Sequence, residues 1–140
     1  MGTSDKRALT RVLFTAGVVA LVDQLSKLVA GLWLSGDIKL APGLSLTLLH
    51  NPAGPLGVSL GGWTRGLNII LALVTIGLVL AVARDLARAV RHATLALGLI
   101  AGASLGNLLS LATTPRGVPD FVAVEVAGEG IVLNVADIAA

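Results

Sequence analysis

The sequence contains no cysteine and only two histidines among its 140 residues. Without cysteine the chain has no disulfide, no thiolate nucleophile and no cysteine-ligated metal. His50 and His92 lie in different segments between apolar runs, so we expect no histidine metal site either. The sequence therefore predicts neither thiol chemistry nor a bound metal.

Charged residues are also scarce, at 13% of the chain, and the formal net charge is only +2. A surface for nucleic-acid phosphates needs clustered lysine and arginine on one face, so we expect no nucleic-acid partner. Hydrophobic residues account for 55%, which fits a membrane protein better than a soluble domain. Aromatic residues are few, so Trp33 and Trp63, which flank apolar runs, form a thin interfacial belt.

Three apolar runs are long enough to cross a bilayer, which takes about 20 residues. They cover approximately residues 12–34, 66–83 and 93–112. The first run is long and contains Asp23, Gln24 and Lys27, so we interpret it as a retained span rather than a cleaved signal peptide. Residues 1–140 are accordingly expected to form a single integral membrane domain.

Basic residues predict the orientation of these spans. They precede the first run and fill the segment between the second and third: Lys6, Arg7, Arg11, Arg84, Arg88 and Arg91. Because cytoplasmic loops carry an excess of lysine and arginine, this pattern predicts a cytoplasmic N-terminus. The segments at about 35–65 and 113–137 would then face the outside.

Those outer segments contain strand-like patterns. "GLSLTLLH" and "DFVAVEV" alternate with a period of two, "AGEG" has turn composition, and "IVLNV" fits a returning strand. The final "ADIAA" is typical of the start of another apolar helix. We therefore predict an all-α membrane bundle with three complete transmembrane helices, the start of a fourth, and a small extracytoplasmic β-sheet.

Two aspartates, Asp120 and Asp137, flank the predicted hairpin near the end of this sequence. If the hairpin folds back, the carboxylates approach each other and tend to share a proton. One could then activate a water while the other donates to a carbonyl, which is aspartic-peptidase chemistry. Two solvated surface acids are the alternative.

Three further polar motifs lie in or beside the apolar runs. Asp23 and Lys27 are four residues apart, so on a helix they share a face, either as a structural ion pair or as a substrate contact. The turn-rich "HNPAGPLG", with Asn51 and Gly54, is either an ordinary loop or a source of main-chain groups that hold a peptide. Asn107 in "GASLGNLLS" either joins helices or orients a catalytic carboxylate.

Taken in order, these motifs resemble the lipoprotein signal peptidase (signal peptidase II) family over almost the whole chain. The matching stretches are "DQLSK" (23–27), "NPAGPLG" (51–57), "GNLLSL" (106–111), "VPDF" (118–121) and "LNVAD" (133–137). The resemblance implies catalytic roles for Asp120 and Asp137. It implies supporting or substrate-binding roles for Asp23, Lys27, Asn51, Gly54, Asn107 and Asn134.

The resemblance also implies a substrate and a location. The substrate would be a prolipoprotein carrying diacylglycerol, cleaved before its lipidated cysteine at the outer face of the bacterial cytoplasmic (inner) membrane. No cofactor is expected, membrane lipid is the surrounding partner, and globomycin-type compounds are the expected inhibitors. A fourth helix would continue from Asp137, and this sequence contains its start.

The chain departs from the family pattern at two places. Ser110 and Leu111 stand where the family has an acid and an arginine, a paired change that leaves neither charge alone. The outer loop has Ala53, Pro55 and Leu56 in place of the usual glycine, alanine and phenylalanine. Two alternatives therefore stay open: a catalytically inactive relative that binds lipidated peptides or a membrane partner, and a small structural subunit of a membrane complex.

Overall fold

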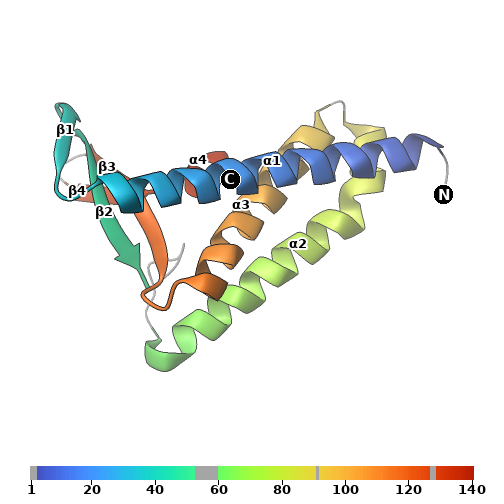
Figure 1. Cartoon of the computed structure of the whole chain (residues 1–140). Helices are drawn as coiled ribbons and strands as arrows, with labels where there is room; N and C mark the ends of the chain where they lie inside the picture. Colours follow the sequence, from blue (N-terminus) through green and yellow to red (C-terminus); the bar gives the residue numbers. More distant parts are fainter. Residues whose placement is uncertain (1–2, 53–59, 91, 127–128) are drawn as a thin grey trace.

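The computed structural model describes residues 3–52, 60–90, 92–126 and 129–140. These residues form a bundle of three long helices with a small antiparallel sheet at one end (Figure 1). The long helices are α1 (Thr3–Trp33), α2 (Thr64–Ala89) and α3 (Ala93–Thr113). The shorter elements are η1 (Gly61–Trp63), β1 (Ile38–Ala41), β2 (Leu44–Asn51), β3 (Val118–Val126), β4 (Glu129–Leu133) and α4 (Val135–Ala139). The predicted fold class, a helical membrane bundle with a small sheet, is confirmed.

All three long helices are long and apolar enough to cross a membrane, with mean hydropathies of 1.7, 2.5 and 1.8. Large apolar side chains point outward along them, such as Phe14, Leu32 and Leu78, each more than 60% exposed. Such a surface suits lipid rather than water. Helix α2 extends beyond its apolar run. Arg84 and Arg88 therefore lie on the helix, whereas the sequence had indicated a loop there. The residues after the run, such as Leu86 and Ala87, are good helix formers and continue the helix.

Small residues let α1 and α3 approach closely. A Cβ atom added at Gly98 would lie 2.5 Å from the Thr15 Cβ, and one added at Gly102 would lie 2.6 Å from the Val19 Cβ. Only glycine fits at these two positions, which is how helices in membranes pack without a strong hydrophobic drive. The buried core beside this crossing consists of Val12, Ala16, Val79, Ala83, Ala93, Leu97 and Ala101.

The sheet has the order β1-β2-β3-β4, with every neighbouring pair antiparallel. The strands predicted from alternation are present as β2 and β3, and the predicted returning strand is present as β4. The four residues of β1 are exposed and carried no usable pattern. Figure 1 shows the sheet at the end of the bundle where α1 finishes and α2 begins. The exposed Trp33 and Trp63 lie at these two helix ends, as expected for tryptophans at a membrane interface.

Candidate active site

Asp137 is held at the first turn of α4 by a capping box. The Asp137 N–H donates to the Oδ1 of Asn134 at 3.0 Å, and the Asn134 N–H donates to the Oδ2 of Asp137 at 3.0 Å. A further hydrogen bond fixes α4 to α1: the Ala136 N–H donates to the Oδ1 of Asp23 at 2.9 Å. These bonds satisfy backbone donors at the start of the helix and fix the Asp137 side chain against it.

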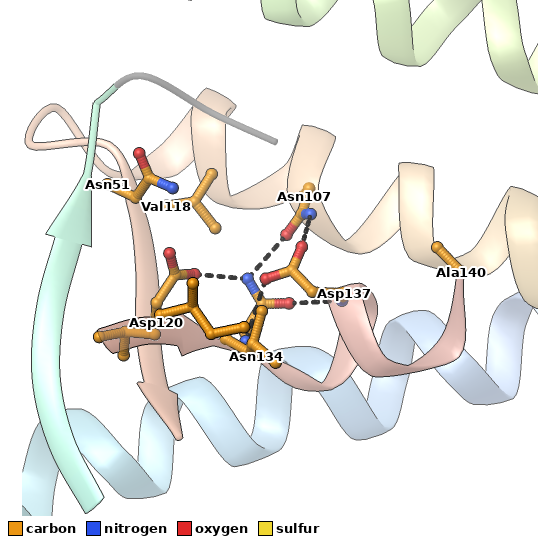
Figure 2. Close-up of a pocket in the computed structure, with 10 residues that line it drawn as sticks. Asn51, Asn107, Val118, Asp120, Asn134, Asp137 and Ala140 are labelled. Carbon is orange, nitrogen blue, oxygen red and sulfur yellow. Dashed lines mark hydrogen bonds between the residues drawn. The ribbon is translucent and has the colours of Figure 1, made fainter. Parts of the chain in front are cut away.

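Asp120 reaches the same place from β3. It is 3% exposed, and its Oδ1 accepts a hydrogen bond from the Nδ2 of Asn134 at 2.6 Å (Figure 2). Asn134 therefore bonds to both aspartates, through its side chain to Asp120 and through its capping box to Asp137. The folded-back hairpin brings the two acids together, as the sequence predicted.

The environment of Asp120 favours its protonated form. Burial raises the pKa of Asp120 above its ordinary value, and the negative charge of Asp137 adds to this rise. Hydrogen bonds from Asn134 and Asn51, together with the positive charge of Lys27, act in the opposite direction on this pKa but do not cancel it. Asp120 therefore keeps its proton to a higher pH than an exposed aspartate does.

The buried Lys27 lies behind the site and forms hydrogen bonds with three polar side chains. The Nζ of Lys27 donates to the Oδ2 of Asp23 at 2.7 Å, to the Oδ1 of Asn107 at 2.8 Å and to the Oγ of Ser110 at 3.1 Å. The Nδ2 of Asn107 then donates to the Oδ1 of Asp137 at 3.2 Å. The expected pairing of Asp23 with Lys27 is thus present, and it connects α1 through α3 to the acid on α4.

Gln24 belongs to this network, although the sequence analysis did not select it. Its Nε2 donates to the Gly106 carbonyl at 2.8 Å, to the Oγ of Ser110 at 3.1 Å and to the Oδ2 of Asp23 at 3.0 Å. The available signal was an amide inside an apolar run, which needs a partner wherever it is buried. Ser110 is 2% exposed, and its hydroxyl donates to the Gly106 carbonyl while it accepts from Gln24 and Lys27.

Arg65 is a second residue that the sequence analysis did not select. Its guanidinium, near the start of α2, donates to the carbonyls of Leu111, Thr114 and Pro115 at the end of α3. A cation there satisfies carbonyls that the helix leaves without partners and opposes the negative end of the helix dipole. No periodicity along the chain could connect two positions about 46 residues apart.

The two aspartates face a cavity of about 430 Å³. It is lined by Asn51, Asn107, Val118, Asp120, Ile131, Val132, Leu133, Asn134, Asp137 and Ala140 (Figure 2). The polar groups gather at one part of this cavity, and side chains of β3 and β4 supply apolar walls. Asp23 and Lys27 lie behind the cavity and do not line it, and Gly54 lies outside the described residues.

The fold and this cavity define a polytopic membrane protein with a paired-aspartate site. The model of the signal peptidase (SPase) II family matches residues 15–140, and the chain belongs to this family, which is a family of aspartic peptidases. The resemblance in the sequence motifs is thereby confirmed.

Solved structures share the fold. Two are described as bacterial membrane enzyme structures determined by the in meso method at 2.3 and 1.9 Å resolution. The first has a TM-score of 0.78 at 20% identity, covering 91% of this chain and 79% of its own. The second has a TM-score of 0.77 at 20% identity, covering 91% and 83%. A search of curated proteins found no match.

Proposed function

We propose that this chain is a membrane aspartic endopeptidase that removes signal peptides from diacylglyceryl-modified prolipoproteins. One observation carries the proposal: Asn134 bonds to both Asp120 and Asp137 at a cavity with apolar walls, in a chain of the signal peptidase II family. Cleavage would fall just before the lipidated cysteine of the substrate.

The proposed reaction assigns different roles to the two acids. Asp120, whose raised pKa favours the protonated form, donates to the oxygen of the scissile carbonyl. Asp137 takes a proton from the attacking water, and both of its oxygens are already held by donors from Asn107 and Asn134. As the tetrahedral intermediate collapses, one of its hydroxyl groups returns a proton to Asp120, and the proton on Asp137 passes to the departing amine. No cofactor enters this sequence.

The surroundings fit a substrate that is partly lipid. The apolar cavity walls suit side chains next to the scissile bond, and the exposed apolar faces of α1 and α2 suit the acyl chains of the substrate. We place the protein in the bacterial cytoplasmic membrane with a cytoplasmic N-terminus, which puts the aspartates at the outer face. A globomycin-type inhibitor would occupy the same cavity.

The test is cleavage of a diacylglyceryl-modified prolipoprotein by the purified chain in detergent. Asp120→Asn and Asp137→Asn should each reduce the rate by at least about a hundredfold, because each removes one half of the proton transfer. Asp37→Asn, an exposed aspartate outside the cavity, is the matched control and should cleave normally. Full activity in either site variant would exclude the proposed roles.

A second function is a catalytically inactive relative that holds lipidated peptides. The observation in its favour is that Ser110 and Leu111 replace the family's acid and arginine directly behind the site. The same assay separates the two functions. Binding of the lipidated peptide without cleavage, unchanged in Asp120→Asn, would favour the inactive relative.

A further inference from the structure

A second cavity lies at the other end of the bundle. It has a volume of about 270 Å³ and is enclosed by α1, α2 and α3. Figure 1 shows the start of α1 and the junction of α2 with α3 together at this end, opposite the sheet. The polar side chains that line it are Asp5, Arg7, Arg11, Arg84, Arg88 and Thr94. The fold thus brings together arginines that are more than 70 residues apart in the sequence.

The charges around this cavity do not balance. Four guanidinium groups line it against one carboxylate, and that carboxylate, on the buried Asp5, forms an ion pair with Arg88. The other three arginines form no hydrogen bond or ion pair with any part of the chain that the structure describes. The cavity is therefore a concentration of positive charge with free donors, and an anion there would relieve the repulsion.

We propose that this cavity binds the phosphate group of an anionic membrane phospholipid. Guanidinium groups match phosphate oxygens with paired hydrogen bonds, and Thr94 adds a hydroxyl donor on α3. Basic pockets between the ends of transmembrane helices are a known form of anionic headgroup site. The Asp5–Arg88 pair connects α1 to α2, the two helices that carry the arginines.

A lipid fits this place better than a free phosphate. The cavity lies at the end of three helices that are long enough to cross a membrane, which is the level of lipid headgroups. Each of the three helices has an exposed apolar side chain within three residues of the lining, namely Phe14, Val82 and Leu95, which acyl chains of a bound lipid could contact. The proposal does not depend on the peptidase function, because this cavity shares no residue with the aspartate site.

Native mass spectrometry of the full chain, released from detergent micelles, tests the proposal. The probes are phosphatidylglycerol, zwitterionic phosphatidylcholine and inorganic phosphate. We expect a one-to-one adduct with phosphatidylglycerol and at least fivefold weaker binding of phosphatidylcholine. Each arginine removed should weaken phosphatidylglycerol binding about fivefold, so the double variant Arg11→Gln/Arg84→Gln should lose about 25-fold.

The control variant is Lys6→Gln/Arg116→Gln, which removes the same charge from exposed positions outside the cavity. It should change binding by less than twofold. An equal loss in the control, or equal binding of both lipids, would overturn the proposal. Competition by inorganic phosphate at the lipid's own concentration would show a free-anion site and would also overturn it. The single variant Arg84→Gln, which breaks no bond in the described structure, keeps the test valid if the double variant unfolds.

Discussion

The two ends of this bundle differ in the burial and the pairing of their charged side chains. At the sheet end, Asp23, Lys27 and Asp120 are at most 5% exposed, and their polar atoms are joined to neighbours in one network. Among the described residues, no buried side-chain nitrogen or oxygen atom lacks a partner. At the far end the four arginines that line the second cavity are exposed, and only Arg88 forms an ion pair with another residue that the structure describes. One end is organised before any ligand arrives, as the proposed catalysis requires, whereas the other has donors that a ligand would organise.

The ion pair Lys27–Asp23 lies at the sheet end and Arg88–Asp5 at the far end. The largest predicted difference between the two ends is the contribution of these pairs to stability. Lys27→Met leaves the fully buried Asp23 carboxylate without its cation, and we expect a loss of about 3–5 kcal/mol in the free energy of unfolding. Denaturant unfolding in mixed micelles measures this loss. The double variant Lys27→Met/Asp23→Asn should recover part of it, since asparagine keeps an acceptor for the Ala136 N–H. No recovery would show that the lysine acts mainly through packing.

Close packing at the sheet end provides the next prediction. A Cβ atom at Gly106 would lie 2.5 Å from the Oδ2 of Asp23, so Gly106→Ala must displace the carboxylate that anchors α4. We expect a loss of about 1–3 kcal/mol in unfolding free energy, together with lower peptidase activity. Gly77→Ala is the control, because a Cβ atom there meets open space and alanine favours helix. A similar loss in both variants would contradict the packing argument.

The ion pair at the far end should matter little for stability. Arg88 is 60% exposed on its side chain, so Arg88→Gln should cost less than about 1 kcal/mol in the same unfolding experiment. A loss as large as that of Lys27→Met would abolish the distinction between the two ends. Each of these two variants removes one cation, from the buried Asp23 in Lys27→Met and from Asp5 and the exposed Asp85 in Arg88→Gln.

The parts of the fold that could be predicted are those with a local signal. Apolar runs of sufficient length indicated the three long helices, alternation indicated β2 and β3, and the turn composition of "AGEG" indicated that β4 returns beside β3. Asp120 and Asp137 could be paired because a short hairpin returns the chain to its starting point. In each case the pattern is repeated along neighbouring residues, so the chain itself carries the information.

The features that could not be predicted depend on contacts between segments that are distant in the sequence. Gln24 bonds to Ser110, and Arg65 to the end of α3, through packing that no local period expresses. The same holds for the arginine cavity, since its members lie on three helices. Helices α1 and α2 also extend beyond the predicted apolar spans, because a helix continues through charged residues once its backbone hydrogen bonds are in place.

The smallest expected effect is a titration shift within the aspartate pair. Burial and the charge of Asp137 both raise the pKa of Asp120, so Asp137→Asn should lower that pKa toward its ordinary value. Because the pKa is raised in the folded state, the contribution of Asp120 to stability is complete below its ordinary pKa. It is lost as the pH rises from that value through the folded pKa, and in Asp137→Asn this loss should be smaller and should end at a lower pH.

Carbon-13 NMR of the labelled Asp120 carboxyl follows this titration directly in micelles. Asp85→Asn serves as the control, because Asp85 is 87% exposed at the other end of the bundle and should leave the Asp120 curve unchanged. An unchanged curve in Asp137→Asn would mean that the two carboxylates do not interact electrostatically. The proposed division into a proton donor and a base would then lose its physical basis, even if both aspartates proved necessary for cleavage.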